Sequence, residues 1–190
     1  MIRPLAPAEL PAAAALAAAA FREDPGFSYI FPDDAARRAR LPALLRALLR
    51  IDRAAGGVVS GAFDGDALVG VSSLLPAGVA EPGLARWLGA VALSPVLFAD
   101  PAALLRGAEV ARAIGPLRPA SSAYLHLMAV HPACQGRGVG AALLREALKD
   151  GPLYLETFAP ENRAWYASRG LKETAQVQGG LRPPFWTFRT

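Results

Sequence analysis

The stretch YLHLMAVHPACQGRGVGAALLREAL, from Tyr124 to Leu148, predicts the central part of the fold. Its first part, Tyr124 to Val130, is a short apolar run that is typical of a buried strand. Pro132 ends that strand, because proline cannot donate a hydrogen bond to a ladder. After the glycines, apolar residues recur at helical spacing, at Val139, Leu143, Leu144, Ala147 and Leu148. The stretch therefore predicts a strand, a glycine-rich turn and a helix in that order.

The turn between this strand and this helix, Gln135-Gly136-Arg137-Gly138-Val139-Gly140, predicts an anion site. Glycines let a ligand approach the backbone closely, and the N–H groups and dipole at a helix N-terminus attract negative charge. No carboxylate lies in the loop to compete for those donors. A phosphate-bearing cofactor is the ligand that we expect there.

The identity of that cofactor depends on which loop template fits. A Walker loop is excluded, because no Gly-Lys-Ser/Thr follows. A dinucleotide fingerprint fits Gly136-x-Gly138-x-x-Ala141, with Glu156 near the spacing of the ribose-binding acid. However, fewer than 50 residues follow Ala141, too few for the rest of a doubly wound sheet. The five residues from His131 to Gln135 also separate strand from glycine, whereas the dinucleotide turn is tight. These features argue against a nucleotide-binding oxidoreductase.

The pattern Gln135-x-x-Gly138-x-Gly140 resembles the acyl-CoA-binding loop of the GNAT (GCN5-related N-acetyltransferase) family. The segment LYLETFAPENRAWYASRGL resembles the family's next block, with a strand at Leu153 to Thr157 followed by Asn162, Tyr166 and Gly170. The ending PPFWTFRT resembles the closing strand of the branch that contains puromycin N-acetyltransferase. The first 21 residues are similar to the family's first strand and helix.

This resemblance implies an α/β fold of the α+β type: a mixed, mostly antiparallel splayed sheet flanked by helices, in a single N-acetyltransferase domain over residues 1–190. The composition agrees, since 53% hydrophobic and 19% charged residues exclude disorder. Apolar spacing predicts helices over Ala8–Arg22 and from Asp33 or Asp34 to Ala54, with a break at Pro25-Gly26. Strands are expected at Met1–Pro4 and, as a hairpin around Asp64-Gly65-Asp66, at Val58–Phe63 and Ala67–Leu75.

A helical insertion at about residues 76–120 departs from the minimal family pattern. It is rich in Pro, Gly and Ala, with helix-like pieces around Leu84–Leu93 and Ala102–Ile114. Two interpretations remain open and are compatible: two helices that complete the core, or a segment that walls the acceptor pocket. Under the second interpretation the candidate lining residues are Trp87, Leu88, Phe98 and Arg112.

The resemblance also implies an activity. An N-acetyltransferase moves the acetyl group of acetyl-CoA to a primary amine of a small molecule by direct attack in a ternary complex, with no metal. The expected contacts with the pantetheine arm are Met128, Ala129 and Val130. The expected pyrophosphate loop is Gln135, Gly136, Arg137, Gly138, Val139, Gly140 and Ala141. Asn162 is expected either to contact the pantetheine or to fix the turn between strand and helix.

Three side chains are the candidate catalytic residues. Tyr166 matches the family's general acid, which protonates the CoA thiolate, although a helical aromatic can also be core. His126 is a candidate general base, because imidazole titrates near neutral pH; alternatively it is a half-buried histidine, and Tyr124 holds a water relay. Strand alternation predicts that Tyr124, His126 and Met128 share one face. Glu156 is expected to orient substrate or water, or to cap the following turn.

The remaining features limit the partners. The net charge is +4, but the arginines are scattered and only Lys149 and Lys172 are lysines, so no nucleic-acid partner is expected. Cys134 is the single cysteine, and no apolar run reaches the ~20 residues of a membrane span, so we expect a cytoplasmic protein without a membrane partner. The alternative function is a non-catalytic acyl-CoA-binding sensor or scaffold, which needs neither Tyr166 nor His126. The acceptor amine and the oligomeric state stay open.

Overall fold

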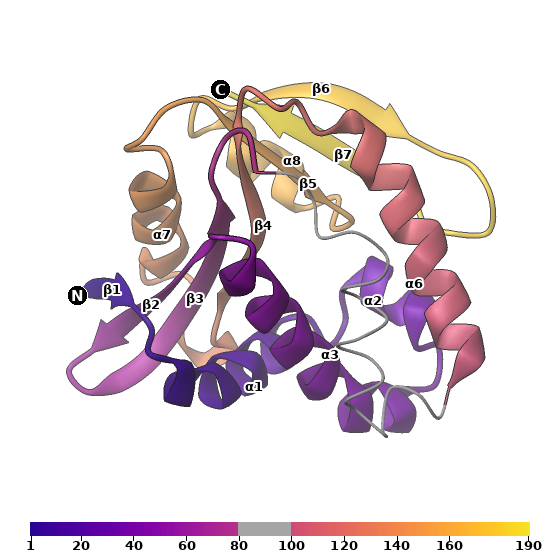
Figure 1. Ribbon diagram of the computed structural model, residues 1–190, viewed down its shortest axis with the longest axis horizontal. Coiled ribbons are helices and arrows are strands. Elements are labelled where there is room, and N and C mark those ends of the chain that lie inside the picture. The colour runs from indigo at the N-terminus through magenta and orange to yellow at the C-terminus, as the bar shows by residue number, and fades with distance from the viewer. Residues whose placement is uncertain (80–99) are drawn as a thin grey trace.

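Figure 1 shows the computed structural model, which describes residues 1–79 and 100–190. Its strands form one sheet in the order β1-β2-β3-β4-β5-β7-β6. Every neighbouring pair is antiparallel except β4 and β5, which are parallel. The mixed, mostly antiparallel sheet is thereby confirmed. The strands are β1 (Ile2–Pro4), β2 (Val58–Asp64), β3 (Ala67–Leu75), β4 (Ala123–Val130), β5 (Leu153–Thr157), β6 (Lys172–Val177) and β7 (Phe185–Arg189).

Helices cover both faces of the sheet. The helices are α1 (Leu10–Ala20), α2 (Pro25–Ile30), α3 (Asp34–Ala54), α6 (Pro101–Ile114), α7 (Val139–Ala147) and α8 (Asn162–Ala167). Short 3₁₀ turns lie at Pro7–Glu9, Gly115–Leu117 and Pro132–Cys134. In Figure 1, α7 lies on the opposite side of β3 and β4 from α3, and α2 lies beside α6. None of the helices in the described ranges is long and apolar enough to cross a bilayer.

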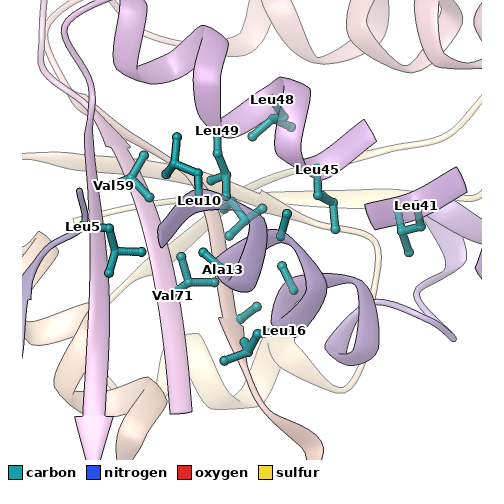
Figure 2. Close-up of a cluster of buried hydrophobic side chains, with 14 residues drawn as sticks. Leu5, Leu10, Ala13, Leu16, Leu41, Leu45, Leu48, Leu49, Val59 and Val71 are labelled. Atoms are coloured by element: carbon teal, nitrogen blue, oxygen red, sulfur yellow. The ribbon is translucent and has the colours of Figure 1, made fainter. Parts of the chain in front are cut away.

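The core on the α1 and α3 side is the cluster drawn in Figure 2. The helix α3 contributes Leu41, Leu45, Leu48 and Leu49, which recur every three or four residues and so lie on one face. They pack against α1 and against strands β2, β3 and β4. The helix that apolar spacing predicted from Asp33 or Asp34 to Ala54 is confirmed.

The core on the opposite face joins α7 and α8 to the last strands. Leu144 and Ala147 of α7 pack with Tyr166 of α8, and with Leu155 and Phe188 of β5 and β7. Leu143 is fully buried beside Val69 of β3. The helical spacing after the glycine loop therefore predicted the buried face of α7 correctly.

Several segment boundaries differ from the sequence-based expectation. Pro25 does not only end a helix; it is the first residue of α2, where Asp24 caps the helix by accepting hydrogen bonds from the N–H groups of Gly26 and Phe27. Strand β6 was not expected, because most of its residues are exposed and polar. The piece predicted at Ala102–Ile114 is confirmed as α6, where Arg112 is exposed. The piece at Leu84–Leu93 and the candidates Trp87, Leu88 and Phe98 lie outside the described residues.

Candidate active site

Strands β4 and β5 are hydrogen-bonded neighbours only at their beginnings. The register pairs Ala123 with Leu153 and Tyr124 with Tyr154, and no further pair follows. Beyond this point β4 continues to Val130 and β5 to Thr157, each with its other neighbour, β3 or β7. The sheet therefore opens between its two central strands, which is the expected splay.

A β-bulge lies in β4 at the start of this opening. Ser73 and Leu74 are consecutive in β3, but their partners in β4 are Leu127 and Leu125, so His126 is the extra residue. A bulge of this kind turns a side chain away from the direction that alternation predicts. The face of the sheet on which the His126 side chain lies is therefore set by the bulge and not by the regular alternation of the strand.

The bulge corrects the prediction that Tyr124, His126 and Met128 share one face. His126 stacks on Tyr124, with ring centroids 4.8 Å apart, and contacts α3. Met128 instead packs with Val139 and other residues on the α7 side. The prediction failed because strict alternation holds only for a strand without a bulge.

A buried carboxylate approaches His126 from the last turn of α3. Nδ1 of His126 lies 2.9 Å and 3.0 Å from the two carboxylate oxygens of Asp52. The hydroxyl of Ser73 donates to Oδ2 of Asp52 over 2.6 Å. The side chain of Asp52 has no exposed surface, whereas that of His126 is 20% exposed. A buried acid is thereby connected through the ring to the accessible side of the site.

A second group of polar side chains lies around Tyr124. Its hydroxyl donates to Oε1 of Glu156, the residue that lies two positions beyond the last β4–β5 pair. The guanidinium of Arg118 lies over the Tyr124 ring at 4.8 Å, and the Tyr154 ring is 5.7 Å away. Tyr124 therefore connects Glu156 on β5 with the stacked ring of His126 on β4.

Tyr166 reaches the same region from α8. It is 7% exposed and packs against Phe188, with ring centroids 5.4 Å apart. Burial, and then the negative charge of Glu156, raise the pKa of the Tyr166 phenol. The phenol therefore keeps its proton throughout the physiological pH range.

The glycine loop leaves space for a ligand at the N-terminus of α7. Gly136 and Gly138 have φ of +75° and +82°, and nothing in the described chain lies within 4 Å of a Cβ built on either. Gly138 is the N-cap and has no side chain to satisfy the first-turn N–H groups. A phosphate-bearing group fits this arrangement, because uncapped N–H groups and a helix dipole both favour an anion.

Three of the residues expected to bind the cofactor make contacts with other parts of the chain. Arg137 pairs with the exposed Asp64 of the β2–β3 hairpin over 2.9 Å. The amide of Gln135 lies 3.5 Å from the carbonyl oxygen of Val130. Asn162 donates from Nδ2 to Oγ1 of Thr157 over 3.1 Å, a bond within the turn between β5 and α8, and its contact with the pantetheine stays a prediction.

A groove between α7 and α8 continues from the loop. It is lined by Ala141, Leu144, Arg145, Leu148, Ser168 and Arg169. The guanidinium of Arg169 lies 3.8 Å from the ring centroid of Trp165, which in turn faces Gly140. Arg169 therefore adds positive charge near Gly140 of the loop, whereas Arg145 lies in the last turn of α7.

Sequence reasoning missed three side chains of this site: Asp52, Ser73 and Arg118. One signal for Asp52 was present. It follows Leu41, Leu45 and Leu48 at helical spacing, so it is a carboxylate within an apolar stripe. Ser73 and Arg118 gave no comparable signal.

The comparisons with known proteins agree with this geometry. Residues 102–173 match the family model described as an acetyltransferase (GNAT) domain. This part of the chain is therefore similar to a GNAT acetyltransferase domain, which uses acetyl-CoA as its cosubstrate. No curated protein matches the sequence.

Three solved structures show the same fold over nearly the whole chain. A "histone acetyltransferase HPA2 and related acetyltransferase" from Corynebacterium glutamicum has a TM-score of 0.73 at 21% identity, covering 100% of this chain and 94% of its own. The PaiA N-acetyltransferase of Thermoplasma acidophilum, in complex with coenzyme A, has a TM-score of 0.56 at 13% identity, covering 98% of this chain and 96% of its own. The polyamine N-acetyltransferase of Drosophila melanogaster has a TM-score of 0.55 at 13% identity, covering 100% of this chain and 98% of its own.

Proposed function

We propose that this chain transfers the acetyl group of acetyl-CoA to a primary amine of a small molecule, by direct attack within a ternary complex. One observation carries the proposal. His126 and Glu156 lie two residues beyond the last β4–β5 pair, one on each strand, where the sheet opens. Groups that can exchange protons thus lie on both sides of the opening, and the far end of β4 leads through the glycine loop to the uncapped N-terminus of α7.

The residues that would hold acetyl-CoA follow from the same geometry. Gln135 to Ala141 would bind the pyrophosphate through backbone N–H groups, and Arg169, which stacks on Trp165 beside Gly140, would add charge near them. The backbone of Met128 to Val130 would bind the pantetheine arm, because its ladder partner in the described chain is β3 alone. Bound there, acetyl-CoA supplies an activated acetyl thioester.

The side chains of this protein would then manage the protons. His126 would take the proton of the acceptor ammonium, since a neutral amine is the nucleophile. Tyr166 would hold the proton that the departing sulfur requires, and its raised pKa keeps that proton in place until it is needed. Glu156, bonded to Tyr124, would orient the acceptor or a water. Much of the rate would come from holding the two reactants in position.

Two broader expectations accompany this proposal. The assignment of residues 1–190 to a single N-acetyltransferase domain stays a prediction. A cytoplasmic location also stays a prediction. Among the acceptors, the family resemblance favours an amino-nucleoside, an arylalkylamine or a similar xenobiotic amine; His126 on its strand resembles the arylalkylamine-modifying branch, and the closing strand resembles the puromycin-modifying branch.

A panel of amines tests the proposal. Tryptamine, phenylethylamine, spermidine and puromycin are each mixed with the protein and acetyl-CoA, and released CoA is detected as free thiol. We expect amine-dependent thiol release together with an N-acetylated product of the matching mass. Tight acetyl-CoA binding without turnover of any amine would favour the alternative, a non-catalytic acyl-CoA-binding sensor or scaffold.

A further inference from the structure

Asp52 is a buried carboxylate that the stability of the fold does not explain. It has no exposed surface and lies in the last turn of α3, where the helix dipole disfavours negative charge. Removing a carboxylate from water costs several kcal/mol unless other groups replace the lost hydrogen bonds. An apolar residue would continue the stripe formed by Leu41, Leu45 and Leu48. The contacts of Asp52 must therefore account for its presence.

Those contacts determine which nitrogen of His126 carries a proton. An ionised carboxylate only accepts hydrogen bonds, so Nδ1 of His126, 2.9 Å from Oδ1, must be the donor. Ser73 donates to the other oxygen and holds the carboxylate in place. In a neutral ring with a hydrogen on Nδ1, Nε2 carries the lone pair. The arrangement makes Nε2 the basic nitrogen.

We propose that Asp52 is a positioning residue that holds His126 in the Nδ1–H tautomer and stabilises its protonated form. This inference rests on the proposed role of His126 as the base. In that step the N–H bond of the acceptor ammonium breaks and an Nε2–H bond forms. The positive charge moves from the acceptor to the imidazole ring, which faces the carboxylate of Asp52. The amine is left neutral and able to attack.

Other ionisable groups also surround the ring. Tyr124 stacks on it from within β4, Glu156 accepts the Tyr124 hydroxyl from β5, and Arg118 lies over the Tyr124 ring. None of them bonds to Asp52 in the described part of the chain. A substitution of Asp52 leaves them in place, so a difference between variant and wild type reports on the carboxylate itself.

Nitrogen NMR of the imidazole rings tests the tautomer without any acceptor. The chain has two histidines, and they make opposite predictions. His126 is expected as the Nδ1–H tautomer. His131 is expected as the Nε2–H tautomer, because its Nδ1 accepts from the N–H of Ala133. In Asp52→Asn the His126 signals should move while those of His131 stay. Finding the Nε2–H tautomer at His126 in the wild type would overturn the proposal.

Steady-state kinetics test whether Asp52 assists the base step. The acceptor is the amine of the panel that turns over fastest. We expect Asp52→Asn to lower kcat/KM by roughly 10²-fold, the usual size of a base effect, with acetyl-CoA affinity and melting temperature close to wild type. The low-pH limb of the profile should move to lower pH, because the imidazolium loses its neighbouring charge. Asp66→Asn, the same change in the exposed β2–β3 turn, should behave as wild type.

A double mutant separates this inference from the proposed function. If Asp52 acts through His126, then Asp52→Asn should cause no further loss of kcat/KM in a protein that already carries His126→Ala. An equal loss in both backgrounds would show that Asp52 is a structural residue, and the inference would fail. If His126→Ala itself has wild-type activity, the base assignment fails, while the NMR result still reports whether Asp52 fixes the tautomer.

Discussion

Tyr166 combines two effects on one phenol. Burial favours its neutral form, and the carboxylate of Glu156 opposes formation of a second negative charge nearby. Both effects keep the proton on the hydroxyl. A general acid must carry its proton when negative charge develops on the sulfur, and the phenol meets that condition.

The first prediction concerns this hydroxyl. Tyr166→Phe keeps the ring that packs on Phe188 and removes only the hydroxyl, so the core should change little. We expect near-normal acetyl-CoA affinity by calorimetry and a kcat lower by about 10- to 1,000-fold, because a transition-state interaction is lost. Tyr29→Phe removes a hydroxyl that bonds to Glu109 and serves as the control, with unchanged kcat. Normal turnover of Tyr166→Phe would make Tyr166 a core aromatic.

Residue roles were only partly predictable from the sequence. The four-residue spacing of Asn162 and Tyr166 places both on α8, as expected. The contact of His126 with Asp52 was not predictable, since 74 residues separate the two. It also requires the bulge in β4, and alternation in the sequence carries no sign of one extra residue. Local patterns find residues, whereas a long-range pair depends on how two elements meet.

At the scale of single elements, the N-terminus of α7 is the part most directly prepared for a ligand. Its N-cap is a glycine with φ of +82°, in the left-handed region that only glycine adopts without strain. Any substitution there carries a similar backbone cost. A test of the anion site must therefore compare two side chains of the same shape.

The second prediction makes that comparison with Gly138→Glu and Gly138→Gln. Both carry the same strain and bulk, but only glutamate places a negative charge where the pyrophosphate is proposed to bind. We expect calorimetry to show weakened acetyl-CoA binding for the glutamine variant and a further loss of about tenfold or more for the glutamate variant. Equal affinities in the two variants would place the phosphates elsewhere.

The third prediction concerns the N-cap of α2. Burial raises the pKa of the Asp24 carboxyl to about 6, with a smaller contribution from Glu161, although hydrogen bonds from the N–H groups of Phe27 and Gly26 oppose the rise. The ordinary value is 3.8, so between these two values the native state binds more protons than the unfolded state. The contribution of Asp24 to stability is therefore fully favourable below pH about 4, and is lost as the pH rises to about 6.

Asp24→Asn keeps an oxygen that accepts the same N–H groups and removes the charge. The free energy of unfolding of the variant should equal that of the wild type below pH about 4 and exceed it at pH 7 by about 2 kcal/mol. One pKa unit corresponds to about 1.4 kcal/mol, and the value is reduced because the site is only half-buried. Urea unfolding at several pH values measures the difference. Asp33→Asn, at the exposed N-cap of α3, is the matched control and should show no such gain. A constant difference across pH would contradict the assignment.

Elements with a strong periodic pattern were predictable, and weak ones were not. Helices α3 and α7 carry apolar stripes that face the sheet, and the bounds of α3 agree with the expectation. Helix α2 is only six residues long, too short to show a period. Strand β6 is largely exposed and polar, so nothing in its composition indicates a strand.

At the scale of the whole molecule, the sheet has two parts with a short connection. Strands β1 to β4 form one part, and β5, β7 and β6 form the other. The ladder between them consists of two residue pairs at the beginnings of β4 and β5. A ligand that binds along the opening would contact both parts. It would form hydrogen bonds with strand backbone that has no partner strand on that side within the described ranges. Binding should therefore stabilise the fold as a whole.

The last prediction follows from this arrangement. At 100 times its Kd, a ligand that binds only the native state adds about 2.7 kcal/mol of stability. For a chain of this size that corresponds to a rise in Tm of roughly 5–10 °C. Acetyl-CoA should produce this rise and NADH should not, because the loop is not the tight turn of a dinucleotide site. Hydrogen exchange should slow in both β4 and β5 when acetyl-CoA is bound, and Gly138→Glu should lose both effects. A rise with NADH would contradict the choice of cofactor, and protection confined to one strand would mean that the ligand does not bridge the opening.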